Sequence, residues 1–308
     1  MKPKHTPVLV KEVARLLSPR AGETYFDGTA GFGGHAQEVL EQIGAGRMIL
    51  SDRDPQAVET LRQAFGENAE VWQLSFSEAA VKLANENIHP NMILLDLGVS
   101  SPQLDQPERG FSFTTDGPLD MRMDTTASLT ASDVVNNYSE QELADIIGRY
   151  GEEHRAKSVA RAIAASRPFT STGQLAAVVR AVAGRDGKID AATRTFQAIR
   201  IEVNQELAEL EIALPILTEQ LAIGGRIAVI SFHSLEDRIV KRWFEQESKD
   251  CICPPATPIC VCDHQASLAK LTKKPVLGSE DSHNLRARSA KLRAAVKLNK
   301  NQKEAHEG

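Results

Sequence analysis

The chain of 308 residues has no cysteine outside one short segment, no long apolar run and no overall excess of positive charge. All four cysteines lie between Cys251 and Cys262, so a general disulfide framework is excluded. No stretch approaches the ~18 apolar residues that a membrane helix needs. The segment from Met1 to His5 lacks the hydrophobic core of a signal peptide. We therefore expect a cytoplasmic protein with no membrane span.

The formal net charge of -5 argues against a uniformly basic nucleic-acid-binding protein. The C-terminal tail departs from this average, because nine lysine and arginine residues lie between His264 and Lys300 against two acidic ones, Glu280 and Asp281. Such a patch binds phosphates even on an acidic protein. A solvated tail without a binding role is an equally weighted alternative.

Apolar runs alternate with amphipathic helical patterns in the first third of the chain. We expect strands at residues 23–26, 47–51, 70–74 and 92–95, with helices between them, and another strand at 224–230 followed by a helix. This alternation is typical of βαβ units. It predicts a doubly wound α/β sheet that binds ligands at the carboxyl ends of its strands.

The alternation stops after the fourth strand. Residues 100–123 are rich in Pro, Gly, Asp and Ser and predict a loop; three helices follow, the first opened by the capping box of Ser139 and Glu142 and the last closed by Gly184. A long helix is expected from Thr193, kinked or restarted at Pro215. We therefore divide the chain into a core of residues 1–105 and 193–308, ending in the basic tail, and an inserted helical substrate-recognition domain of residues 106–192.

The most informative segment runs from Asp27 to His35 and reads Asp-Gly-Thr-Ala-Gly-Phe-Gly-Gly-His. Glycines at a strand-to-helix turn let the backbone approach a ligand, and the following helix N-terminus offers N–H groups. The carboxylate of Asp27 would repel a pyrophosphate but suits a cationic amino or sulfonium group. The segment therefore favours S-adenosylmethionine. A dinucleotide, whose fingerprint Gly31 to Ala36 also fits, and a plain turn are the alternatives.

Two further aspartates follow predicted strands. Asp52 comes after the second strand, where an acidic side chain accepts hydrogen bonds from ribose hydroxyls, although an Asp in a turn is often only a cap. Asp96 ends the fourth strand, and with Gln103 and the backbone carbonyls of Gly98 to Ser101 it would orient an exocyclic amine for methyl transfer. The usual Asp/Asn-Pro-Pro-aromatic motif of amino methyltransferases is absent. Methylation at cytosine C5 is disfavoured, because no cysteine lies near a predicted strand end.

Three other features allow both a functional and a structural interpretation. His233, after the later strand, would bind a base or shuttle a proton, but a structural histidine is the more frequent case. Phe76 would pack on an adenine ring or lie in the core. Four thiols at Cys251, Cys253, Cys260 and Cys262 are typical of tetrahedral zinc ligation, although chance clustering in a loop is an equal alternative.

Long motifs spread over nearly the whole chain resemble one family, the bacterial small-subunit ribosomal RNA (16S rRNA) cytosine-N4 methyltransferases, known as the RsmH or MraW family. The motifs are residues 5–9, 27–35, 52–55, 94–105, 109–113, 116–124, 192–200, 231–238 and 286–293. The resemblance implies a class I, Rossmann-like S-adenosylmethionine-dependent methyltransferase with an inserted all-helical domain. Its substrate would be a cytosine N4 amine in the decoding region of the small subunit.

The resemblance also carries cofactor contacts onto positions of this sequence: Gly33, Gly34, His35, Asp52, Phe76, Asp96 and Gln103. The composite prediction adds Asp27 to this cofactor site and assigns Asp96, Ser101 and His233 to catalysis. Naked ribosomal RNA, an assembled subunit and a homodimer are all left open. The alternatives are a non-catalytic RNA-binding or ribosome assembly factor and a nicotinamide-dependent oxidoreductase.

Overall fold

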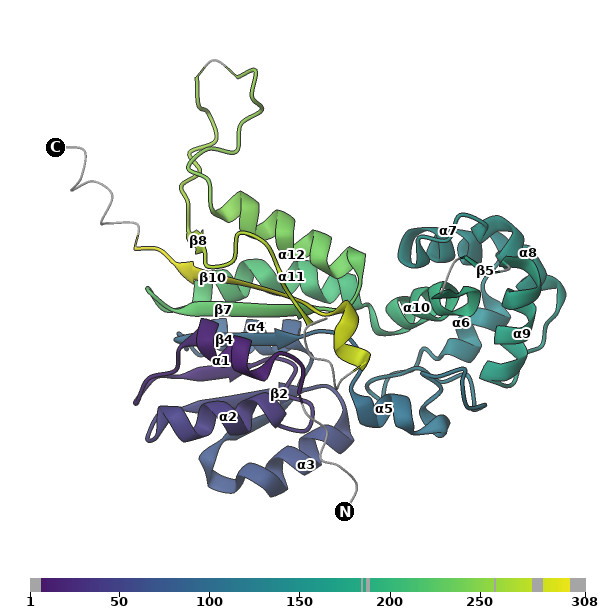
Figure 1. The fold of residues 1–308 in the computed structure, drawn as a ribbon, viewed down its shortest axis with the longest axis horizontal. Helices are drawn as coiled ribbons and strands as arrows, with labels where there is room; N and C mark the ends of the chain where they lie inside the picture. Colours follow the sequence, from purple (N-terminus) through teal and green to yellow (C-terminus); the bar gives the residue numbers. More distant parts are fainter. Residues whose placement is uncertain (1–6, 184, 187–188, 258, 279–284, 300–308) are drawn as a thin grey trace. The chain divides into compact units, whose positions relative to one another are not determined.

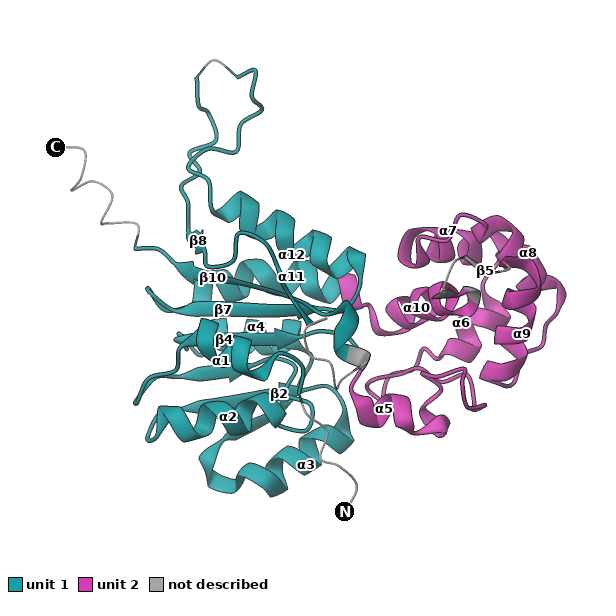
Figure 2. Cartoon of the chain, in the orientation of Figure 1, with its two compact units in different colours: residues 1–98, 208–308 teal, residues 99–207 magenta. Residues whose placement is uncertain are grey.

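The computed structural model describes residues 7–183, 185–186, 189–257, 259–278 and 285–299, and divides the chain into two compact units (Figures 1 and 2). Unit 1 consists of residues 1–98 and 208–308, and unit 2 of residues 99–207. Of the positions named above, Met1, His5, Gly184, Glu280, Asp281 and Lys300 lie outside the described residues.

Unit 1 is an α/β unit with one eight-stranded sheet in the order β3-β2-β1-β4-β7-β10-β8, and β9 pairs with β10. Strands β3, β2, β1, β4 and β7 are parallel, and β10 is antiparallel to β7. The strands are β1 (Tyr25–Asp27), β2 (Met48–Asp52), β3 (Glu70–Gln73), β4 (Met92–Asp96), β7 (Arg226–Ser231), β8 (Leu268–Lys270), β9 (Val276–Leu277) and β10 (Lys291–Lys297). The helices are α1 (Val10–Leu17), α2 (Gly34–Ile43), α3 (Pro55–Phe65), η1 (Gly66–Asn68), α4 (Phe76–Asn85), α11 (Glu206–Gln220, which begins at the unit boundary), α12 (Ser234–Glu247) and η4 (Leu285–Ser289).

Alternate residues of the strands supply two separate apolar cores, one on each face of the sheet. Tyr25 and Leu94 pack with α1, α2 and α3 on one face, whereas Phe26 and Leu95 pack with α4, α11 and α12 on the other. The buried strands therefore read as the near-continuous apolar runs typical of a parallel sheet. The predicted doubly wound α/β sheet is confirmed.

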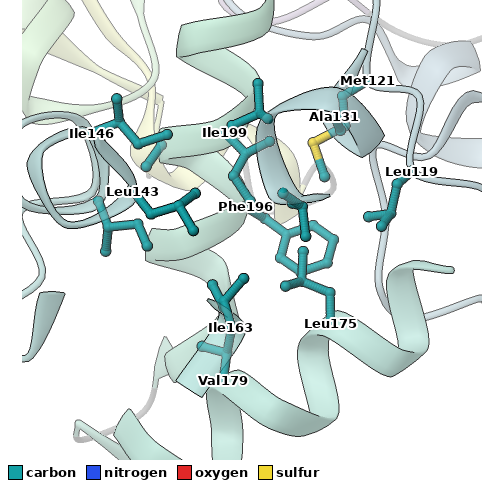
Figure 3. Close-up of a cluster of buried hydrophobic side chains, with 14 of the residues drawn as sticks. Leu119, Met121, Ala131, Leu143, Ile146, Ile163, Leu175, Val179, Phe196 and Ile199 are labelled. Atoms are coloured by element: carbon teal, nitrogen blue, oxygen red, sulfur yellow. The ribbon is translucent and has the colours of Figure 1, made fainter. Parts of the chain in front are cut away.

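Unit 2 is mainly helical. Its elements are α5 (Ser101–Asp105), η2 (Pro107–Arg109), α6 (Ala131–Asn137), α7 (Glu140–Gly151), α8 (Ala156–Ala165), α9 (Thr172–Ala183), the short strands β5 (Arg185–Asp186) and β6 (Ile189–Asp190), and α10 (Ala191–Asn204). The predicted capping box opens α7, where the Ser139 side chain accepts a hydrogen bond from the backbone N–H of Glu142. Figure 3 shows how Leu143, Ile163, Leu175 and Phe196 meet in a core to which Leu119 and Met121, from the segment before α6, also contribute.

The unit boundaries differ from those expected from the sequence. Helix α10 packs against α7 and α9, so it belongs to unit 2, whereas the sequence pattern predicts that the core resumes at residue 193. The expected long helix is also two helices, α10 and α11. They are separated at Gln205, which has a φ of 51°, while Pro215 lies inside α11. The left-handed conformation of Gln205, rather than the proline, ends the first helix.

Candidate active site

The glycine-rich loop between β1 and α2 is shaped mainly by packing. A Cβ atom on Gly33, whose φ is 81°, would lie 2.5 Å from the Phe65 ring, and one on Gly34 would lie 2.2 Å from the Pro7 ring. Gly31 differs from these, because the nearest heavy atom to its added Cβ is 3.9 Å away. Protein packing therefore accounts for Gly33 and Gly34, and Gly31 is the glycine with open space beside it.

Asp27, at the end of β1, is 1% exposed and has two hydrogen-bond donors. The Tyr25 hydroxyl donates to its Oδ2 at 2.9 Å, and the backbone N–H of Thr29 donates to its Oδ1 at 3.1 Å. Burial raises the pKa of Asp27 to about 6, against the opposing effects of His35 and of the two hydrogen bonds. The site thus contains a buried carboxylate that a neighbouring cation would stabilise in its ionised form.

Asp52 ends β2 and holds the glycine loop against this strand. Its carboxylate accepts a hydrogen bond from the backbone N–H of Gly31 at 2.8 Å and another from that of Asp54 at 2.9 Å. Burial raises the pKa of Asp52 to about 6, although both N–H groups act in the opposite direction. The side chain fixes the one loop glycine that has open space beside it, and its role as a ribose acceptor stays a prediction.

His35 and Asp96 form a partly buried pair. His35, in the first turn of α2, is 7% exposed, and its Nε2 lies 3.5 Å from Oδ2 of Asp96 at the end of β4. Burial by itself would lower the pKa of His35, but the carboxylates of Asp96 and Asp27 outweigh this effect and raise it. The backbone N–H of Asp96 donates to Oγ1 of Thr29, which ties β4 to the glycine loop.

This pair contains unused hydrogen-bonding capacity. Among the described residues, Oδ1 of Asp96 and Nδ1 of His35 are buried with no hydrogen-bond partner, while Nε2 of His35 faces Oδ2 of Asp96. Buried polar atoms are rarely left without partners, so a ligand atom is the natural completion of the site. No side chain in the described part of the chain caps α2, so its first N–H groups add donors for a polar ligand.

The three carboxylates lie at one edge of the sheet. Asp52, Asp27 and Asp96 end β2, β1 and β4, which are neighbours in the sheet and parallel. This is the edge at which doubly wound sheets bind ligands. Acceptors spread over three strand ends suit a nucleoside that carries hydroxyl groups and a cationic group, so the residues fit S-adenosylmethionine.

Phe76 and His233 both have a structural role in unit 1. Phe76 is the first residue of α4, is half-buried and packs on the apolar core beneath that helix. His233 is the N-cap of α12: its Nδ1 accepts from the backbone N–H of Glu236 at 3.4 Å, and its Nε2 lies 3.2 Å from Oε1 of the same residue. The adenine contact of Phe76 and the proton-transfer role of His233 stay predictions.

Ser101 and Gln103 belong to unit 2, where they open the short helix α5. Both are buried, and the Gln103 side chain accepts a hydrogen bond from the backbone N–H of Ser100 at 3.0 Å in a capping box. Their assignments to the amine site and the cofactor stay predictions.

Part of the basic tail belongs to the sheet. Lys291 and Arg293 lie in β10, and both contact the carboxylate of Asp237 in α12; the Arg293 Nε to Asp237 Oδ1 distance is 2.7 Å. Arg293 is 9% exposed. Its charge therefore stabilises the fold and is not available to phosphates.

The sequence interpretation missed two groups of the site, Tyr25 and Thr29. Tyr25 lies two residues before Asp27 in the same strand, and this spacing places both side chains on one face. That pattern was a usable signal for the tyrosine, whereas nothing in the sequence pairs Thr29 with Asp96.

No helix within the described residues is long and apolar enough to cross a membrane.

Comparisons with known proteins extend over nearly the whole length of the chain. The sequence model of the MraW methylase family matches residues 2–298. The ribosomal RNA small subunit methyltransferase H of Trichlorobacter lovleyi is 50% identical over 308 residues, covering 96% of this chain and 98% of that protein. The protein of the same name from Syntrophotalea carbinolica is 49% identical with the same coverage. A solved S-adenosylmethionine-dependent O-methyltransferase from Thermotoga maritima is 10% identical with a TM-score of 0.43, covering 97% of this chain and 69% of that one.

The family match decides between the alternatives that the sequence left open. The sheet with its inserted helical unit is a class I, Rossmann-like methyltransferase fold, as predicted. Neither the oxidoreductase nor the non-catalytic assembly factor is favoured by these relatives. The chain belongs to the MraW methylase family.

Proposed function

We propose that this protein transfers a methyl group from S-adenosylmethionine to the N4 amine of a cytosine in the decoding region of small-subunit ribosomal RNA. The relatives named ribosomal RNA small subunit methyltransferase H support the substrate class. The observation that carries the proposal is the row of carboxylates at the ends of β2, β1 and β4, with Oδ1 of Asp96 buried and unpartnered among the described residues.

The cofactor would be held by residues of unit 1. Asp27 would bind its cationic amino group, Asp52 its ribose hydroxyls and Phe76 its adenine ring, while the backbone at Gly33 and Gly34 would lie along it. When bound, S-adenosylmethionine supplies an electrophilic methyl group. The carboxylates of Asp96 and Asp27 raise the pKa of His35, so its imidazolium would carry a positive charge beside the Asp96 carboxylate and help to hold that side chain in place.

The acceptor amine would be oriented by Asp96. An exocyclic cytosine amine is a weak nucleophile. A carboxylate that accepts a hydrogen bond from one of its N–H groups aligns the amine and stabilises the positive charge that develops on nitrogen. We keep the predicted roles of Ser101 and His233 in catalysis and of Gln103 in cofactor binding as parts of this proposal, and the helical unit would recognise the RNA. With such a substrate the protein would work in the cytoplasm.

The test is a methylation assay with the donor and small-subunit RNA, either naked or in assembled subunits, read as N4-methylcytidine by mass spectrometry of digested RNA. We expect the product with wild type and at least a tenfold slower reaction with Asp96→Asn, since about 1.4 kcal/mol of lost transition-state stabilisation has this effect. Methylation of another atom, or of neither RNA form, would refute the proposal. Titration with S-adenosylhomocysteine separates a missing donor site from a wrong acceptor.

A further inference from the structure

The loop of residues 248–265, between α12 and β8, lacks the usual means of holding a shape. None of its described residues is buried, and none lies in a helix or strand. Its two ends are joined at the neck, where the backbone N–H of Ser267 donates to the carbonyl of Glu247 at 2.9 Å and that of Ala266 donates to Asp250 at 3.2 Å. Beyond this neck, the loop residues that the structure describes form no apolar core.

The four thiols nevertheless converge there. The Sγ atoms of Cys251, Cys253, Cys260 and Cys262 all lie within 4.8 Å of one another. Two of the separations are 3.5 Å, between Cys260 and Cys262, and 3.8 Å, between Cys262 and Cys251. In a tetrahedral site with sulfur about 2.3 Å from zinc, the sulfur atoms are about 3.8 Å apart, so these separations match zinc coordination.

The backbone repeats the same contact on both arms of the loop. The N–H of Ile252, between the first two cysteines, donates to Sγ of Cys262 at 3.4 Å, and the N–H of Val261, between the last two, donates to Sγ of Cys253 at 3.4 Å. Each Cys-x-Cys pair thus supports a thiol of the other pair. Backbone N–H groups that donate to ligand atoms are the usual second layer of a metal site, because they stabilise thiolate charge.

We propose that these four cysteines bind one structural zinc ion, which orders the loop in place of an apolar core. Four protein ligands close the coordination sphere, so the site is structural and leaves no position for a substrate. The proposal is independent of the methyl transfer reaction. Helix α12 starts at the carboxyl end of β7 and runs back along the sheet, so the loop projects from the edge opposite the row of carboxylates (Figure 1).

The test uses the full chain, purified without a metal-binding tag in buffer free of chelators. Metal analysis should find about one zinc per chain. Cys253→Ser and Cys262→Ser should each reduce this to a small fraction, while Ala256→Ser, a matched change in the same loop to a side chain that is no ligand here, should keep it. Replacement by Co²⁺ should give the visible absorption of a tetrahedral thiolate site, which is lost in both cysteine variants.

A second measurement keeps the proposal falsifiable if a cysteine variant folds poorly. Chelation of zinc from the wild-type protein should expose the loop to rapid proteolysis between residues 248 and 265, and added zinc should reverse this. The affinity for S-adenosylhomocysteine should change less than twofold, because that site lies at the other edge of the sheet. Absence of metal with four freely reactive thiols, two disulfides, or iron in place of zinc would each overturn the assignment.

Discussion

At the scale of single residues, the buried carboxylate of Asp27 lowers the stability of the fold when it is ionised and has a role in the proposed site. Burial raises its pKa from 3.8 to about 6, so the folded protein holds this proton more tightly than the unfolded chain does. The resulting stabilisation is complete below about pH 4 and is lost as the pH rises through about 6. A shift of this size corresponds to about 3 kcal/mol.

We therefore expect Asp27→Asn to be more favourable to stability at pH 8 than at pH 4, by up to about 3 kcal/mol, because the amide is never ionised. Its oxygen can still accept the hydrogen bond from Thr29. Urea denaturation of both proteins at the two pH values measures the difference. Glu41→Gln, an exposed acid-to-amide change in α2, is the control and should show no such dependence. An equal change in unfolding free energy at both pH values would mean that ionisation of Asp27 does not destabilise the folded protein.

Asp52 allows the cofactor role to be separated from the structural one. Asp52→Ala removes the acceptor for the N–H groups of Gly31 and Asp54, whereas Asp52→Asn keeps one oxygen, loses only one of the two hydrogen bonds and should be less destabilised than the Ala variant. If the carboxylate binds the ribose, Asn should still weaken binding of S-adenosylhomocysteine about 10- to 100-fold, the effect of losing about 1.5 to 3 kcal/mol in charged hydrogen bonds. Calorimetric titration measures this. Unchanged affinity in the Asn variant would limit Asp52 to holding the loop.

At the scale of elements, one carboxylate of α12, Asp237, pairs with two basic side chains of β10. Burial alone would raise the pKa of Asp237, but Arg293 and then Lys291 outweigh this and lower it. Asp237→Ala would leave the guanidinium of Arg293 buried and unpaired, so we expect a loss of about 3 to 5 kcal/mol of unfolding free energy. The double variant Asp237→Leu with Arg293→Met should lose less, since it removes both charges. Denaturant unfolding tests this order, and an equal loss in the two variants would contradict it.

The same strand shows what the sequence could not reveal. The parallel strands were predictable, because Met92–Asp96 and its neighbours are apolar runs followed by helical patterns. Strand β10 carries Lys291, Arg293 and Lys297, and in the sequence these charges are typical of a solvated tail. Only the structure shows that Lys291 and Arg293 pair with Asp237 in α12. Since that partner is remote in sequence, no local pattern identifies β10 as a strand.

The candidate site divides in the same way. Strand-end aspartates are visible in the sequence, because each follows an apolar run and the parallel sheet brings the strand ends together. The packing of Gly33 and Gly34 against Phe65 and Pro7 was not visible, since it depends on the placement of α3 and of the segment before α1. The capping role of His233 depends on an acidic residue three positions later, which was a readable but weak signal.

At the scale of the whole molecule, each unit buries its own apolar core. Phe196 is 4% exposed in the core of unit 2, where its ring packs edge-on against Phe113 at 4.8 Å, and Phe244 is 2% exposed in the core of unit 1. The row of carboxylates belongs to unit 1 alone. Donor binding and RNA recognition should therefore respond differently to damage in the two cores.

Phe196→Ala and Phe244→Ala form a matched pair, and each should cost about 3 to 5 kcal/mol in the unit that contains it. We expect Phe196→Ala to leave the affinity for S-adenosylhomocysteine within about twofold of wild type, a difference of about 0.4 kcal/mol, because the row of carboxylates belongs to unit 1. Methylation of ribosomal RNA should fall in the same variant. In Phe244→Ala the donor site belongs to the same unit as the weakened core, so S-adenosylhomocysteine should protect this variant against thermal unfolding. In Phe196→Ala the weakened core is that of unit 2, and the same ligand should not protect that unit. Calorimetric titration, thermal unfolding with and without ligand, and the methylation assay measure these responses. Equal loss of donor affinity in both variants would show that the donor site depends on the helical unit, and the division of roles proposed for the two units would then be wrong.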